Sequence, residues 1–249
     1  MRLSPNNLIY LTLLLLFFIG QTGLAGGLRC EEMLLYRGGL SPVVKSNSFV
    51  TSRDLSEYRG GLHKGFKASL DSLKPQDTWI DLGAGKGNAA TDYFKESADP
   101  LTRANVVLIT YKLGRWFGIP EFKKKLSVMQ GRLFEAILAH QIPKAKLITD
   151  FFGVLSYTRD LSRSLYLIFD RLEVGGELYI YSHNMTTVID YHNKIYSLTD
   201  FLKQIEGLEV EGRHGILKIT KLAGDIQIPD LLLTRLNEDE KPAFRRFSY

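Results

Sequence analysis

Short apolar segments alternate with polar stretches along most of the chain, and their spacing predicts alternating strands and helices. Five segments have the apolar and β-branched composition of strands: 78–82 (TWIDL), the residues leading to Asp150, 176–182 (GELYIYS), 208–213 (LEVEGR) and 215–222 (GILKITKL). Residues 88–97 and 161–169 place apolar side chains at helical spacing, and Gly175-Gly176 is expected to end the second helix. The last two strands flank a glycine-containing turn, which predicts a hairpin. The pattern is that of an α/β protein.

The N-terminal segment differs from the rest of the chain. An uncharged apolar stretch runs from Leu8 to Ile19 after Arg2, and small residues follow it. This is the layout of a secretory signal peptide, with cleavage after Ala25. Residues 8–24 are also just long enough to stay as an uncleaved membrane anchor. We therefore expect an exported protein, periplasmic or extracellular, or one anchored in a membrane through its N-terminus.

Composition narrows the classes of partner. Of the 249 residues, 45% are hydrophobic and 24% charged, which is enough apolar material for a sizeable core. The formal net charge is +5, but acidic and basic residues are interspersed, so a nucleic-acid partner is not expected. Cys30 is the single cysteine, which excludes an intramolecular disulfide. The five histidines show no H-x-x-x-H spacing, and no metal site is predicted.

Three glycines follow the strand 78–82 within five positions, as Gly83, Gly85 and Gly87 in the sequence DLGAGKG. Because a helix is predicted directly after them, they occupy a strand-to-helix turn, where backbone amides and the helix N-terminus can approach a ligand closely. The dinucleotide fingerprint would need a glycine where Asn88 stands, and the P-loop would need serine or threonine at Gly87. The spacing found is Asp-Leu-Gly-x-Gly-x-Gly.

The segment IDLGAGKG, residues 80–87, resembles the first motif of class I S-adenosylmethionine-dependent methyltransferases, and the order of later elements agrees over residues 66–223. The resemblance implies a doubly wound, mostly parallel seven-stranded sheet with helices on both faces and a C-terminal antiparallel hairpin. It places the second and third strands at 105–112 and 126–135.

Three regions are expected along the chain. Residues 1–25 would be the signal peptide or anchor, and residues 66–249 the methyltransferase-like domain. The segment 26–65 between them carries the pentapeptide YRGGL twice, at 36–40 and 58–62. Its position predicts an extension that lies over the site as a lid and helps to select the substrate.

The resemblance also implies a site for the cofactor S-adenosyl-L-methionine. The residues expected to line it are Asp81, Gly83, Ala84, Gly85, Gly87, Thr110, Tyr111, Gly131, Arg132 and Asp150. Asp81 and the glycines would hold the methionine part. Two positions depart from the family pattern: Thr110 and Tyr111 stand where an acid usually holds the ribose, and Arg132 where an acid usually lies near the adenine amino group. A hydroxyl binds ribose more weakly than a carboxylate, and a guanidinium cannot accept a hydrogen bond from an amine.

Asp150 and His183 are the candidate catalytic residues, because both follow predicted strands on the same rim of the sheet. Asp150 would orient or deprotonate the substrate, and His183 would act as a general base near neutral pH. Phe151, Phe152 and Tyr157 would wall the transfer site. In the alternative, Asp150 caps a loop or helix, the phenylalanines pack in the core, and His183 only caps or packs.

The sequence leaves two functions open. The first is methyl transfer by direct in-line displacement, in which a nucleophilic atom of a small-molecule or protein acceptor attacks the sulfonium methyl group. The second is an exported or membrane-associated binding protein that keeps the fold and has lost catalysis. Export favours the second, because S-adenosylmethionine is made in the cytoplasm, whereas the intact DLGAGKG loop favours the first. An anchored chain with its domain in the cytoplasm would reconcile the two.

Overall fold

The computed structural model describes residues 51–110, 120–131, 134–158, 160–182, 187–191 and 194–235. The predicted signal peptide or anchor, residues 1–25, and most of the predicted extension 26–65 lie outside these residues. Among the residues that are described, no helix combines the length and the apolar character needed to cross a bilayer.

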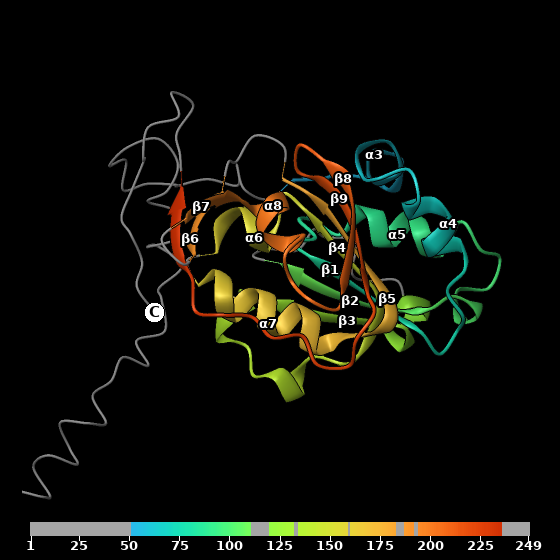
Figure 1. Ribbon diagram of the computed structural model, residues 1–249. Coiled ribbons are helices and arrows are strands. Elements are labelled where there is room, and N and C mark those ends of the chain that lie inside the picture. Colours follow the sequence, from blue (N-terminus) through green and yellow to red (C-terminus); the bar gives the residue numbers. More distant parts are fainter. Residues whose placement is uncertain are drawn as a thin grey trace, which may run out of the picture.

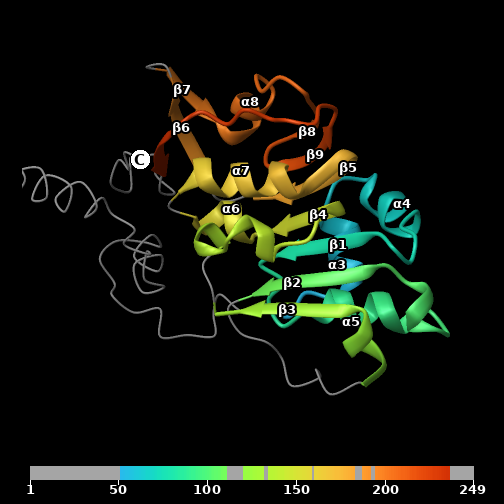
Figure 2. The ribbon, with the colours of Figure 1, turned by 90° about the horizontal axis from the view of Figure 1, so that it is seen from below.

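Seven strands form the central sheet, in the order β3-β2-β1-β4-β5-β9-β8 (Figure 1). In chain order these are β1 (Thr78–Leu82), β2 (Asn105–Thr110), β3 (Leu126–Gln130), β4 (Ala145–Phe151), β5 (Leu172–Tyr181), β8 (Leu208–Arg213) and β9 (Ile216–Lys221). The strands β1 to β5 pair in parallel, whereas β9 is antiparallel to both of its neighbours. Figure 2 shows β3, β2, β1 and β4 side by side.

Helices cover both faces of this sheet. One face carries α3 (Leu55–Gly61), α4 (Phe66–Asp71) and α5 (Asn88–Lys95), and the other carries α6 (Val154–Tyr157), α7 (Leu161–Arg171) and α8 (Leu198–Leu202). Short 3₁₀ helices lie in the connections: η3 (Pro100–Thr102), η4 (Pro120–Lys124), η5 (Phe134–Ala136) and η6 (Ala139–Gln141). The predicted fold, a doubly wound and mostly parallel sheet that ends in an antiparallel hairpin, is confirmed.

A smaller sheet was not foreseen from the sequence. It consists of β6 (Thr187–Tyr191), β7 (Lys194–Ser197) and β10 (Leu232–Arg235). The strands pair antiparallel in the order β10-β6-β7, so the chain after β9 returns to the segment that follows β5.

The first strand, β1, is buried on both faces, which explains why its sequence does not alternate between apolar and polar residues. On one face Trp79 packs against Phe66 and Tyr93, with ring centroids 6.4 and 5.5 Å apart. On the other face Ile80 joins the core beneath α7. The indole nitrogen of Trp79 donates a hydrogen bond to the hydroxyl of Thr149 in β4 at 2.9 Å, so β1 is also tied to its neighbour through side chains.

The junction between α7 and β5 corrects one prediction. The helix ends at Arg171 and the strand begins at Leu172, so Gly175 and Gly176 lie within β5 and do not end the helix. The pairing of β5 with β4 shifts register near this point, and Gly175 has a φ of +72°. Glycine suits such an irregularity because other residues are strained at positive φ.

The end of α7 is instead held by a buried lysine. The ammonium of Lys221, whose side chain is 2% exposed, donates to the carbonyl oxygens of Phe169 and Leu172 at 2.6 and 3.0 Å. Phe169 lies in the last turn of the helix and Leu172 is its C-cap, and a cation is favourable at this end of a helix. Strand β3 is also shorter than the predicted 126–135: it ends at Gln130.

Candidate functional site

The carboxyl ends of β1 and β4 mark the point at which the strand order of the sheet reverses. From β1 the chain passes through α5 to β2 on one face, and from β4 it passes through α6 and α7 to β5 on the other. Ligands of doubly wound sheets bind outside the strand ends at such a point. The glycine loop, residues 83–87, lies here and ends at Gly87, the N-cap of α5, whose φ is +76°.

The glycine loop needs glycine because two other segments approach its backbone closely. Gly83 and Gly85 have φ values of +79° and +56°. A Cβ atom at Gly83 would lie 2.4 Å from Cα of Gly153, in the turn after β4. A Cβ atom at Gly85 would lie 2.4 Å from the carbonyl oxygen of Thr51. Both backbone conformation and space therefore exclude a side chain at these two positions.

Hydrogen bonds to β2 hold the glycine loop in place. The amides of Gly83 and Ala84 both donate to the carbonyl oxygen of Ile109, at 2.8 and 3.1 Å. The hydroxyl of Thr110 donates to the carbonyl oxygen of Gly85 at 2.6 Å, and its side chain is only 4% exposed. Thr110, which was expected near the ribose, therefore stabilises the glycine loop through this hydrogen bond.

Asp81 lies near the end of β1, and its carboxylate is fully buried among groups of the same chain. The hydroxyl of Tyr58 in α3 lies 2.9 and 3.1 Å from the two carboxylate oxygens and donates to them, and the hydroxyl of Thr149 donates at 2.8 Å. Burial raises the pKa of Asp81 to about 7, and it also raises the pKa of Tyr58, so the phenol keeps the proton it donates. The residue that the resemblance assigns to the cofactor thus bonds to its own chain.

Asp150 makes the contacts of a capping residue. Its carboxylate accepts hydrogen bonds from the amides of Gly153 and Leu155, each at 2.7 Å, and its side chain is 1% exposed. Burial raises the pKa of Asp150 to about 7, and the two amides oppose this increase. Asp150 thereby shapes the turn from β4 into α6, the same turn that packs against Gly83.

The two buried carboxylates are expected to make the protein less stable as the pH rises through neutrality. The pKa values of Asp81 and Asp150 are about 7 in the folded state, above the ordinary value of 3.8. The folded protein therefore binds more protons than the unfolded chain between these values, and the stability present on the acid side is lost as the pH rises through 7. We expect the free energy of unfolding, measured with urea, to fall by on the order of 5 kcal/mol from pH 5 to pH 8, about half of it from each carboxylate.

Two substitutions identify the source of that pH dependence. Asp81→Asn is expected to reduce the pH dependence by about half, because it removes one of the two titrating carboxylates and leaves Asp150. Asp225→Asn, which changes an exposed aspartate, is expected to leave the profile as in the wild type. A wild-type stability that rises from pH 5 to pH 8 would contradict the assignment of raised pKa values to these carboxylates.

Aromatic rings and a cation lie at the end of β4. Phe151 is 5% exposed and packs against Tyr58, with ring centroids 5.0 Å apart, so it occupies a core position. Phe152 is partly exposed and has a φ of +51°. The guanidinium of Arg53 lies 4.7 and 5.0 Å from the centres of these two rings, within the range of cation–π attraction. This end of the sheet therefore carries a positive charge that lies over two phenylalanine rings.

Most of the predicted site residues come together. The following lie at or next to the carboxyl ends of β1 to β4: Asp81, Gly83, Ala84, Gly85, Gly87, Thr110, Gly131 and Asp150. Gly131 is exposed, and its amide donates to the carbonyl oxygen of Thr110 at 2.9 Å. Four other predictions fall on positions or side chains outside the described part of the chain: Tyr111, Arg132, Tyr157 and His183.

Sequence reasoning missed three residues of this end of the sheet. Tyr58 and Thr149 bind the carboxylate of Asp81, and Arg53 supplies the cation. Tyr58 belongs to the second copy of YRGGL, and that repetition was the one signal available in the sequence. Nothing in the neighbouring residues marks Arg53 or Thr149.

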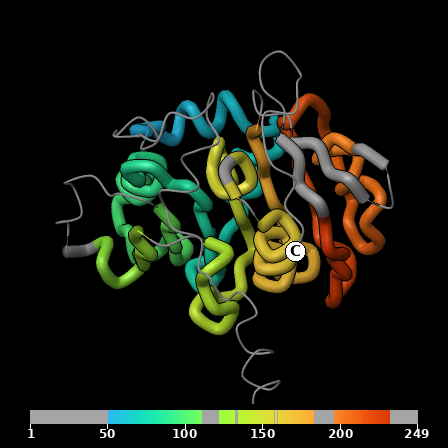
Figure 3. The backbone as a smooth tube through the Cα atoms, turned by 90° about the vertical axis from the view of Figure 1, so that its left-hand side faces the viewer, coloured from blue at the N-terminus to red at the C-terminus, as the bar shows by residue number. Residues whose placement is uncertain are grey.

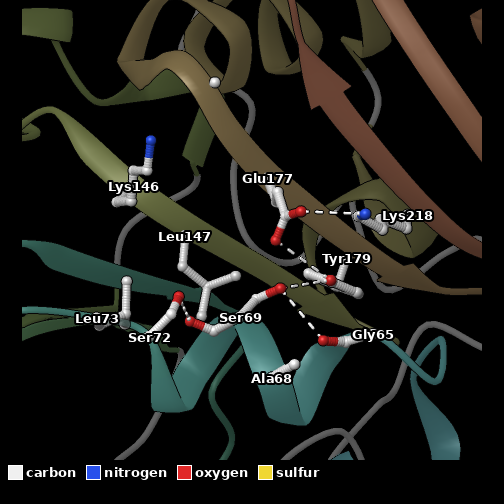
Figure 4. A pocket seen from close by; sticks show the side chains of 11 residues that line it. Gly65, Ala68, Ser69, Ser72, Leu73, Lys146, Leu147, Glu177, Tyr179 and Lys218 are labelled. Carbon is white, nitrogen blue, oxygen red and sulfur yellow. Dashed lines mark hydrogen bonds and ion pairs between the residues drawn. The ribbon is translucent and has the colours of Figure 1, made fainter.

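A separate hollow of about 410 Å³ lies on the α4 side of the sheet, toward the amino ends of β4 and β5 (Figure 4). Several of its polar groups bond to one another. The hydroxyls of Ser69 and Tyr179 are 2.7 Å apart, Tyr179 donates to Glu177 at 3.3 Å, and Lys218 pairs with Glu177 at 3.1 Å. Burial raises the pKa of Tyr179 to about 12, which keeps it a hydrogen-bond donor. This network joins α4 to β5 and β9.

Comparison with known proteins adds a fold-level likeness. No protein-family model and no curated protein matches the chain. Among solved structures, it is similar to CalS10, an amino pentose methyltransferase from Micromonospora echinaspora with SAM bound (TM-score 0.39, 9% identity, 68% of this chain and 92% of that one). It is also similar to an O-methyltransferase family protein from Burkholderia thailandensis (TM-score 0.39, 12% identity, 64% of this chain and 56% of that one).

MNMC2 from Aquifex aeolicus is a third similar structure, with a TM-score of 0.38 and 15% identity over 64% of this chain. The present chain spans 57% of the length of that protein. Likeness at this level adds nothing about the chemistry of this chain, which has to be argued from its own residues.

Proposed function

We propose that this chain binds S-adenosyl-L-methionine at the glycine loop and transfers its methyl group to a small-molecule or protein acceptor. The observation that supports this most is where the loop lies. The motif Asp-Leu-Gly-x-Gly-x-Gly begins with the last two residues of β1 and ends at Gly87, the N-cap of α5, at the point where the strand order of the sheet reverses. The spacing of the motif and the place where doubly wound sheets bind ligands thus point to the same loop.

The backbone of the loop fits the amino-acid end of this cofactor. The amide of Lys86 donates to the carbonyl oxygen of Thr51 at 2.8 Å, so the loop accommodates an acceptor oxygen at this amide. A carboxylate oxygen meets the same need and forms a stronger bond, because it is charged. Arg53 lies beside Thr51, with its guanidinium 2.9 Å from the Thr51 hydroxyl, and contributes positive charge for an anion.

When bound, the cofactor supplies an electrophilic methyl group, whose bond to positively charged sulfur breaks as a nucleophilic atom of the acceptor attacks in line. Such a displacement depends mainly on positioning, which a rigid strand end provides. Both oxygens of Asp150 accept backbone amides, so Asp150 serves by shaping the turn after β4. His183 stays the proposed base for an acceptor that must lose a proton.

A second candidate function is favoured by a specific observation. The carboxylate of Asp81, the hydroxyl of Thr110 and the amide of Lys86 all bond to groups of the same chain. In a binding protein that keeps the fold without methyl transfer, these groups would stay bonded to the chain itself and would not take up the cofactor. Whether the loop takes up cofactor separates the two functions.

Calorimetric titration of S-adenosyl-L-methionine into the full chain tests the proposal. We expect measurable binding by the wild type and binding at least about tenfold weaker by Gly85→Asp, because a side chain there is strained at positive φ and adds a like charge beside the ligand carboxylate. Gly224→Asp is the matched control, since a Cβ at Gly224 meets nothing within 4 Å. Circular dichroism checks that each protein is folded. A folded wild type that does not bind would favour the second candidate.

A further inference from the structure

Residues 51–61 contact the glycine loop, the end of β4 and α5. We call this segment the strap; it consists of a leading end, residues 51–53, and the helix α3 that follows after Asp54 (the first, blue part of the tube in Figure 3). The strap is the part of the predicted extension 26–65 that the structure describes up to the end of α3.

Two hydrogen bonds place the leading end directly on the glycine loop. The carbonyl oxygen of Thr51 accepts the amide of Lys86 at 2.8 Å, and that of Ser52 accepts the side-chain amide of Asn88 at 2.7 Å. The approach is close, since a Cβ at Gly85 would lie 2.4 Å from the Thr51 oxygen. Ser52 is exposed and Thr51 is partly exposed, so water can replace these bonds at little cost.

The helix behind the leading end is held far more firmly. Leu55 and Tyr58 are each 1% exposed, and Tyr58 donates its hydroxyl to the buried carboxylate of Asp81. Arg59 pairs with Glu96, the C-cap of α5, through two hydrogen bonds, at 2.6 and 2.8 Å. Buried apolar side chains contribute more to stability than exposed hydrogen bonds do. Arg53 is also anchored, because its guanidinium donates to the carbonyl oxygen of Phe151 at 3.0 Å and lies over an aromatic ring. Thr51 and Ser52 can therefore leave the loop while Arg53 and α3 stay in place.

The boundary between the two parts of the strap is sharply defined. Asp54 accepts the amide of Glu57 at 2.9 Å, and the Glu57 carboxylate accepts the amide of Asp54 at 2.8 Å. This capping box fixes the start of α3 independently of the residues before it. Motion of Thr51 and Ser52 would thus not extend into α3.

We propose that the leading end of the strap competes with the ligand for the glycine loop. In the closed state Thr51 occupies the amide of Lys86, and Thr51 and Ser52 must move off the loop before a ligand carboxylate can bind there. The identity of that ligand, S-adenosyl-L-methionine, rests on the proposed function. The closed strap is thus an autoinhibitory contact. The apparent affinity for the ligand equals the affinity of the open form multiplied by the fraction of molecules that are open.

Hydrogen exchange of single amides, followed by NMR on the full chain, tests the opening without any ligand. We expect the Lys86 amide to be at least about tenfold less protected than the Gly87 amide, which bonds to Ala84 within the loop itself. Asn88→Ala removes the bond to Ser52 and is expected to reduce the protection of Lys86 by about 2- to 10-fold, with Gly87 unchanged.

Asn105→Ala is the matched control for this variant. The side-chain amide of Asn105 bonds to the carbonyl oxygen of Asp77 at 3.2 Å, at the opposite ends of β1 and β2 from the glycine loop. It is expected to leave Lys86 protection as in the wild type. Equal protection of Lys86 and Gly87 in both the wild type and Asn88→Ala would overturn the proposal, because the leading end would then open only together with the loop.

Calorimetry with S-adenosyl-L-methionine then tests the competition. We expect Asn88→Ala to bind about 2- to 10-fold more tightly than the wild type, and Asn105→Ala to bind as the wild type does. Unchanged or weaker binding by Asn88→Ala would overturn the competition. If none of the three proteins binds, the proposed function fails, and the exchange measurement alone decides whether the leading end opens.

Discussion

Replacing Gly153 by alanine is expected to destabilise the folded protein by about 3–5 kcal/mol. A Cβ atom there would lie 1.9 Å from the carbonyl oxygen of Leu82 and 2.8 Å from Oδ1 of Asp150. Neither atom can move away without separating β1 from β4, because both lie at the buried contact between these strands. Urea denaturation followed by circular dichroism measures the loss.

Gly60→Ala is the matched control for this substitution. A Cβ at Gly60, within α3, meets nothing within 4 Å. Its stability is therefore expected to equal that of the wild type or to exceed it slightly, since alanine is the better helix former. If Gly153→Ala proved as stable as Gly60→Ala, the turns after β1 and β4 would not be in contact, and the arrangement of the candidate site would be wrong.

Replacing Asp150 by alanine is expected to cost about 2–5 kcal/mol of stability, because two buried amides would lose their acceptor. The amides of Gly153 and Leu155 each donate to this carboxylate at 2.7 Å. The same urea titration measures the effect, at a single pH so that titration of Asp81 does not contribute to the difference. Asp150→Asn keeps one acceptor oxygen and is expected to lose about half as much.

The Asp150 variants also separate a capping role from a catalytic one. Asp225→Ala, at an exposed position, serves as the control and is expected to change stability little. If Asp150 is a capping residue, its substitution lowers the stability of the protein, and ligand binding falls only because the protein is less stable. An Asp150→Ala protein that kept wild-type stability and lost methyl transfer would show that the carboxylate acts on the substrate.

The local pattern of hydrophobic and polar residues predicted the helices and strands that are determined by their own sequence. TWIDL forms β1 because its apolar and β-branched side chains suit a strand that is buried on both faces. The helix α5 follows because its apolar side chains recur at helical spacing. The hairpin of β8 and β9 follows from alternation on both sides of a glycine-containing turn. The resemblance extended these elements to a seven-stranded, mostly parallel sheet with a C-terminal antiparallel hairpin, and this prediction is confirmed.

The local pattern failed where the structure of a segment depends on contacts with residues far away in the sequence. Gly175 and Gly176 signalled a break, but whether glycine ends a helix or relieves a strand depends on the register of β5 against β4. The smaller sheet needed β10 to return to β6, which lies far away in the sequence. Neither choice can be made from the residues beside it.

For the candidate site, the division between sequence and structure is the same. The sequence by itself determined the chemistry offered at the strand ends: an acid, three close glycines and a following helix. Only the tertiary structure decided which groups use that chemistry. It placed Tyr58 on the carboxylate of Asp81 and Thr51 on the amide of Lys86. The physical reason is that a hydrogen bond is satisfied by whichever donor or acceptor the fold brings within reach, and the separation of these residues along the chain leaves no local trace of the pairing.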